Sequence, residues 1–144
     1  MDRTKLLKPL LLLMFFLIAF HYVGLKFYWD YTTWWWDMIM HFLAGFWEGL
    51  LFLWFFSIKD IPFLKPSLDF RDPKLFHKAI FYVLLIGLWW EIFEFYINNY
   101  LSMYSFDMID TSSDVILVLA GGFLAISYFS KRIMSSGQNN VQLK

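Results

Sequence analysis

The sequence predicts an all-α membrane protein: a single domain of residues 1–144, folded as a bundle of four transmembrane helices. Composition is the first reason. Hydrophobic residues make up 60% of the chain and charged residues 17%, whereas a typical soluble domain has about 45–50% apolar and about 25% charged residues. A small soluble domain buries only roughly two thirds of its surface. It would therefore leave much of this apolar surface in water.

Four long apolar segments are the second reason, because a membrane-spanning helix needs about 20 mainly apolar residues. The segments are residues 6–27, 34–58, 76–98 and 109–129. Residues 59–75 hold three of the four prolines and several charges, which predicts a loop, and residues 132–144 are a polar tail that we expect to fray. No small-x-small cleavage pattern follows the first segment, which predicts a retained helix rather than a signal peptide.

The positions of the basic residues predict the orientation of the bundle. All Lys and Arg residues except Lys26 lie before or at the start of the first segment, lie between or beside the second and third, or follow the fourth. Basic residues concentrate on the cytoplasmic side of membrane proteins, so we expect both termini to be cytoplasmic. Basic and acidic residues number 12 each, and this balance gives no basic face for nucleic acid. The absence of cysteine excludes disulfides and thiolate chemistry.

Acidic residues lie inside the apolar segments, where each charge costs about 2.5–3.5 kcal/mol. Helical spacing places them, with one histidine and several glycines, on one face of the second, third and fourth segments. These faces should turn inward, because glycine lets membrane helices approach closely. All three bring their polar groups to a similar depth near the outer side. The acidic residues are Asp37, Glu48, Glu91, Glu94, Asp110 and Asp114.

A bound divalent cation is the sharpest interpretation of this cluster, because closely spaced carboxylates at low dielectric need protons or a cation to compensate them. Oxygen-rich ligation with one imidazole suits Mg²⁺, Mn²⁺ or Ca²⁺, with Zn²⁺ also compatible. The expected ligands are Asp37, His41, Glu91, Glu94, Asp110 and Asp114. The expected supporting residues are Glu48, His21 and Asp107.

Two alternatives to a bound cation stay open. In the first, protonated carboxyls and neutral His41 hydrogen-bond across helices and hold the bundle together, although such bonds average only about 0.6 kcal/mol in membranes. In the second, the acidic residues form a proton or cation pathway. No acidic series continues from Glu48 toward the cytoplasmic side, so the cluster is predicted to be one-sided.

Three motifs carry a family likeness. Residues 36–42 (WDMIMHF) followed by Gly45, residues 90–94 (WEIFE), and residues 110–114 (DTSSD) followed by Gly121 resemble the signature of small VanZ-like membrane proteins, the YjdF-type proteins in particular. The resemblance implies a multi-pass protein of the bacterial cytoplasmic membrane. The broader VanZ pattern has Gln at the position of Glu94 and Asn at that of Val118, so the resemblance is to the YjdF type and leaves the activity unassigned.

We therefore expect an outward-facing acidic site that binds a divalent cation and binds or acts on an envelope lipid or lipid-linked substrate. If the protein is an enzyme, the expected class is a metal-dependent hydrolase or transferase acting on a lipid-linked phosphate or ester. The alternatives are a non-catalytic assembly or envelope-stress factor and a small proton- or cation-coupled transporter. The expected partners are membrane lipids, and Gly45 and Gly49 offer a face for a homo-oligomer.

Overall fold

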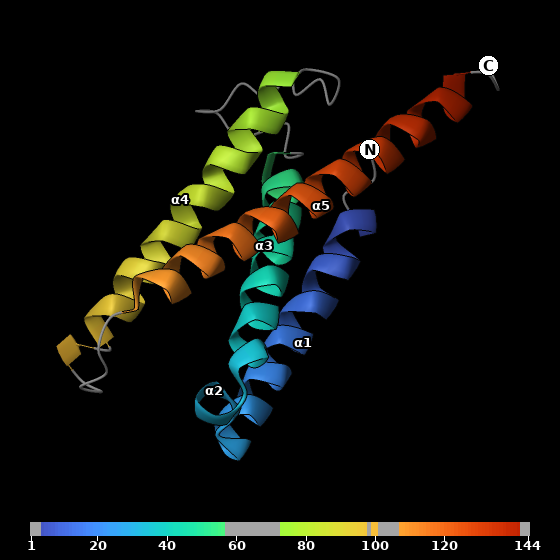
Figure 1. The fold of residues 1–144 in the computed structure, drawn as a ribbon. Helices are drawn as coiled ribbons and strands as arrows, with labels where there is room; N and C mark the ends of the chain where they lie inside the picture. Colours follow the sequence, from blue (N-terminus) through green and yellow to red (C-terminus); the bar gives the residue numbers. More distant parts are fainter. Residues whose placement is uncertain (1–3, 57–72, 98, 101–106, 142–144) are drawn as a thin grey trace.

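The computed structural model describes the backbone of residues 4–56, 73–97, 99–100 and 107–141, and the described part of the chain contains helices and no strand. Four helices are long and apolar enough to cross a membrane, which confirms the predicted fold class. The elements in chain order are α1 (Thr4–Phe27), α2 (Trp29–Thr32), α3 (Trp34–Phe56), α4 (Pro73–Ile97) and α5 (Met108–Val141) (Figure 1).

The four long helices alternate in direction. Helices α1 and α4 run toward one end of the bundle, and α3 and α5 run back from it (Figure 1). The one-turn helix α2 lies at this end, which we call the α2 end. Tyr28 makes the turn from α1 into α2 with a φ of 57°, a left-handed conformation that few non-glycine residues adopt. At the α2 end, therefore, the start of α3 and the start of α5 lie near the end of α4.

Helix α3 is the central element, and its most extensive contact is with α5, which crosses it (Figure 1). The crossing depends on glycine. A Cβ atom at Gly45 would overlap the backbone carbonyl of Val118, and one at Gly121 would overlap the carbonyl of Phe42. The predicted inward glycine faces are thus confirmed. Gly49 also packs against α5, so the Gly45 and Gly49 face is covered by α5 within the chain.

Helix α1 contacts α2 and α3 among the described helices. Its first half is anchored by Leu6 and Leu10, which are buried in the apolar core. The indole N–H of Trp47 on α3 donates a hydrogen bond to the carbonyl oxygen of Leu10 over 3.1 Å. Near the α2 end, the ring of Trp36 packs against α1, where a Cβ atom at Gly24 would overlap it. Helix α1 therefore supports α3 from outside the acidic faces.

Helix boundaries differ from the predicted spans in three places. Helix α4 begins at Pro73, inside the predicted loop 59–75, because proline at a first helical position sacrifices no hydrogen bond. Helix α5 continues to Val141 through most of the predicted tail, and no proline follows residue 73 to interrupt it. The residues between the first two predicted segments contain the helical turn α2. The predicted positions 57–72, 98 and 142–144 lie outside the described residues.

The glycine contact between α3 and α5 predicts the effect of adding a single methyl group. We expect Gly45→Ala and Gly121→Ala to lower the thermal unfolding temperature in detergent, because each new Cβ would push two helix backbones apart at a cost of about 1–3 kcal/mol. Ala120→Leu is the matched control, since Ala120 is exposed on the same helix. Unchanged unfolding temperatures in both glycine variants would contradict so close a crossing.

Candidate metal centre

The structure brings five of the predicted ligands together between α3, α4 and α5, and we call them the acidic cluster: Asp37, His41, Glu91, Glu94 and Asp114. They form two overlapping groups. One potential ligand atom from each of Asp37, His41 and Asp114 lies within 4.8 Å of the other two, and the same holds for His41, Glu91 and Glu94. His41 belongs to both groups and is therefore the centre of the cluster.

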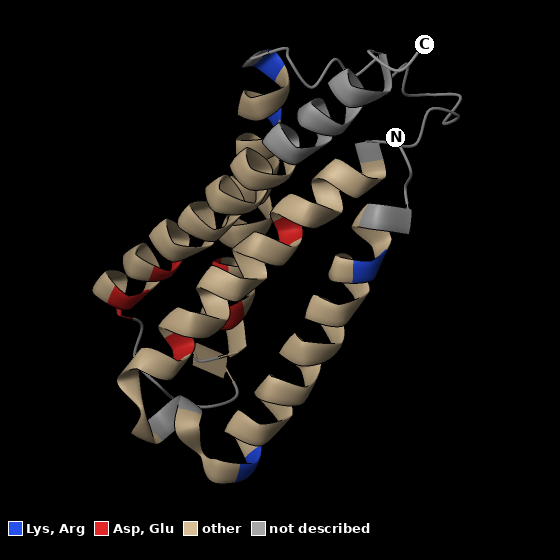
Figure 2. Cartoon of the chain, turned by 90° about the vertical axis from the view of Figure 1, so that its right-hand side faces the viewer, with Lys and Arg blue, Asp and Glu red and all other residues tan. Residues whose placement is uncertain are grey.

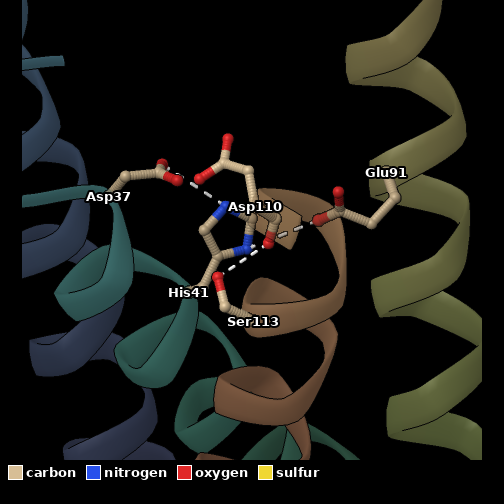
Figure 3. Close-up of polar contacts among 5 residues, drawn as sticks. All are labelled: Asp37, His41, Glu91, Asp110 and Ser113. Atoms are coloured by element: carbon tan, nitrogen blue, oxygen red, sulfur yellow. Dashed lines mark hydrogen bonds and ion pairs between the residues drawn. The ribbon is translucent and has the colours of Figure 1, made fainter. Parts of the chain in front are cut away.

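The imidazole of His41 lies between two carboxylates (Figure 3). Its Nε2 atom is 3.4 Å from Oδ1 of Asp37, which precedes it by one turn of α3. Its Nδ1 atom is 3.8 Å from Oε1 of Glu91 on α4. The ring thus connects two helices through its opposite edges.

Burial separates the cluster from an ordinary surface patch of acids. Asp114 is 2% exposed, His41 6% and Glu91 8%. Oδ1 of Asp114 and Oε1 of Glu91 are buried and accept no hydrogen bond. Buried polar atoms in proteins almost always have a partner, and an exception calls for a cause such as an ion. Two carboxylate oxygens of this kind, beside one imidazole, are suitable ligands for a divalent cation.

The crossing of α3 and α5 sets the register of the cluster. Gly45 follows His41 by four residues, and Val118 follows Asp114 by four residues. Both helices start at the α2 end, so the contact between Gly45 and Val118 lies one turn below His41 on one helix and one turn below Asp114 on the other. His41 and Asp114 are consequently held at the same level by a contact between backbones.

None of the lysine side chains that the structure describes is buried with the cluster. The described Lys residues with described side chains are Lys8, Lys26, Lys74 and Lys78, and all four are exposed. In Figure 2 the Lys and Arg segments lie toward the helix ends, whereas most Asp and Glu segments lie farther along the helices. Within the part of the chain that the structure describes, His41 is thus the one group of the cluster able to carry a positive charge.

The remaining predicted residues occupy different positions. Asp110 is exposed at the first turn of α5 and belongs to neither group of three. Glu48 is 8% exposed, two turns along α3 from His41, and its Oε2 atom accepts no hydrogen bond. His21 is exposed on α1. Asp107 accepts a hydrogen bond from the backbone N–H of Ile109 over 2.9 Å, which makes it the N-terminal cap of α5.

Thr111 lies at the site and was not predicted from the sequence. Its side chain, on α5, faces the carboxylate of Glu91 on α4. The available signal was spacing, because Thr111 precedes Asp114 by three residues and shares its face of the helix. Ser113 does not take this role, because its hydroxyl donates to the Asp110 carbonyl over 2.7 Å (Figure 3).

Four membrane-spanning helices around a buried cluster of acids and one histidine define a small multi-pass membrane protein. The chain belongs to the family described as "Predicted membrane protein (DUF2238)", whose family model matches residues 1–134. The match includes all four spans and every residue of the acidic cluster. No curated protein and no solved structure matches the chain.

The unpaired carboxylate of Asp114 predicts a stability effect. After metal removal by EDTA, we expect Asp114→Asn to leave the thermal unfolding temperature unchanged or to raise it, because the substitution removes a buried charge that has no hydrogen-bond donor. Asp110→Asn is the matched control, one turn earlier on α5 and exposed. A clear fall in the unfolding temperature of Asp114→Asn would instead support a cluster whose role is to hold the helices together.

Proposed function

We propose that the acidic cluster binds a divalent cation on the outer side of a bacterial cytoplasmic membrane, and that the bound cation engages the phosphate of an envelope lipid or lipid-linked substrate. One observation carries the proposal. Asp114 is buried, its Oδ1 atom accepts no hydrogen bond, and it lies in a group with Asp37 and His41 that offers three ligand atoms within 4.8 Å. The bacterial setting follows from the motif resemblance to VanZ-like and YjdF-type proteins.

Electrostatics supports a cation in this position. The four carboxylates of the acidic cluster surround one imidazole in a region without a described Lys or Arg. Burying an ionised carboxylate without compensation is costly, and an inward-facing acid in a membrane helix is by default a functional group. A divalent cation supplies two positive charges at the point where the carboxylates converge. It also satisfies the oxygen atoms that the protein leaves without donors.

The position of the cluster favours a substrate at the membrane surface. The side chain of Asp37 is 40% exposed, and Asp110 is exposed beside it at the α2 end. Large aromatic side chains are exposed at the same end, as in the belts that lie at the level of lipid headgroups. They are Tyr28, Trp34, Trp35, Tyr96 and Tyr100. A cation held by this cluster would therefore keep open coordination positions near the phosphate layer.

A metal at this site would supply Lewis-acid chemistry for the hydrolysis or transfer of a phosphate or ester. Asp110 is the group placed to accept a proton near it, because it is an exposed carboxylate that belongs to neither ligand group. The depth of the cluster argues for a one-sided site rather than a transport pathway. Beyond Glu48, the buried residues of α3 are Gly49, Leu50, Phe52 and Leu53, and none of them has a polar side chain.

Metal content tests the first part of the proposal. We expect protein purified in dodecyl maltoside and dialysed against Mg²⁺, Mn²⁺, Ca²⁺ or Zn²⁺ to retain close to one ion per chain for at least one of these metals, measured by mass spectrometry. The Asp37→Asn/Glu91→Gln/Asp114→Asn variant should retain none, and His21→Gln, an exposed control, should match the parent. A parent protein that stays metal-free after dialysis against all four ions would refute the proposal.

Contact between the bound cation and a lipid phosphate tests the second part of the proposal. With Mn²⁺ bound, we expect strong broadening of the ³¹P resonance of dihexanoylphosphatidylglycerol added to the protein in dodecyl maltoside, a detergent without phosphorus. The broadening should disappear with EDTA and be much weaker for Asp114→Asn, because the paramagnetic ion would no longer be held near the lipid phosphate. Equal broadening for the parent and the variant would show that the site does not engage headgroup phosphate.

A further inference from the structure

The two ring nitrogens of His41 face different groups of the cluster. Nε2 is close to Asp37, and Nδ1 is close to Glu91 (Figure 3). A neutral imidazole has one nitrogen with a free lone pair and one that carries a proton. His41 can therefore be a ligand in only one of the two groups at a time. The nitrogen on the other side must donate its N–H.

We propose that the cluster holds a single cation, bound by Nε2 of His41 together with Asp37 and Asp114, and that Glu91 is a positioning residue that accepts the Nδ1–H. This inference rests on the proposed metal site and specifies its number of ions and its ligands. Histidines that bind metals almost always donate their other N–H to a carboxylate, a carbonyl or water, which fixes the tautomer and strengthens the ligand. Glu91 stands in that position.

The contacts of the two groups differ in a way that supports this assignment. Asp37 and His41 are on one helix, and Asp114 is on the helix that crosses it at Gly45 and Gly121. These three ligands are thus fixed by the closest backbone contact in the described structure. Glu91 is on α4, whose packing against α3 is less extensive.

Glu91 and Asp114 have different neighbours in the cluster. Oε1 of Glu91 is 3.8 Å from Nδ1 of His41, and the Thr111 side chain lies near the same carboxylate. Oε1 has no hydrogen-bond partner, so an N–H on Nδ1 would supply the donor that this atom lacks. Asp114 has the most buried side chain of the cluster, and its Oδ1 atom also has no hydrogen-bond partner, which suits a ligand that faces the opposite edge of the ring.

Nitrogen NMR tests the assignment on the protein with its cluster intact. Protein labelled with ¹⁵N-histidine is loaded with Zn²⁺ in dodecyl maltoside, and the His41 signals are assigned by their absence in His41→Gln, with His21 and His77 as exposed references. We expect Zn²⁺ to shift Nε2 while Nδ1 keeps its one-bond coupling to hydrogen. Zn²⁺ on Nδ1, or calorimetry giving two ions per chain, would overturn the inference while leaving a metal site in place.

The Zn²⁺ affinity of Glu91 variants distinguishes a positioning role of Glu91 from a ligand role. We expect Glu91→Leu to weaken Zn²⁺ binding by about 10- to 100-fold at an unchanged ratio of one ion per chain, the usual effect of losing an outer carboxylate. Glu91→Gln should recover most of the affinity, because its amide oxygen still accepts the Nδ1–H, and the exposed control His21→Gln should leave the affinity unchanged. Loss of all binding in Glu91→Gln would make Glu91 a ligand. A parent protein that binds none of Zn²⁺, Mg²⁺, Mn²⁺ and Ca²⁺ would instead remove the proposed function itself.

Discussion

The contact of two helix backbones at Gly45 and Gly121 is the constraint from which the rest of the structure follows. It lets α5 cross α3 closely enough for Asp114 to reach the level of His41. Because the contact between Gly45 and Val118 lies one turn from both residues, neither can move along its helix axis independently of the other. Helix α4 then adds Glu91 and Glu94 from the remaining side, and α1 supports α3 from outside. The acidic cluster therefore depends on the crossing of α3 and α5.

One half of this bundle has the packing expected of a stable core, whereas the other half contains buried groups that lower stability. The apolar half of the core, around Leu50, Leu53 and Val83, is packed as the interior of a membrane protein should be. At the α2 end, the same helices bury carboxylates whose oxygens lack donors. Local features that break the rules of stable packing are typical of functional sites. A membrane makes the exception more pronounced, because water is not available at depth to satisfy unpaired groups.

Sequence alone predicts the spans and the inward faces, because hydropathy and the helical period depend only on residue order. It correctly places His41, Glu91 and Asp114 toward the interior. It does not predict which helices cross, because glycines on three faces are compatible with several pairings, and Val118 carries no signal of its own. Asp110 shares a helix face with Asp114, yet it is exposed at the first turn of α5. Angular position on a helix does not determine burial at its end.

The order of the helices along the chain has a consequence for biogenesis. Asp114 is on a helix that is synthesised after the helices that carry Asp37, His41 and Glu91. Chains are made from the N-terminus, so α3 and α4 must reside at the translocation machinery or in the bilayer with their polar faces uncovered until α5 arrives. The polar cluster is therefore completed only when α5 inserts, and a chain that stops before α5 keeps its costly acids without the helix that covers them.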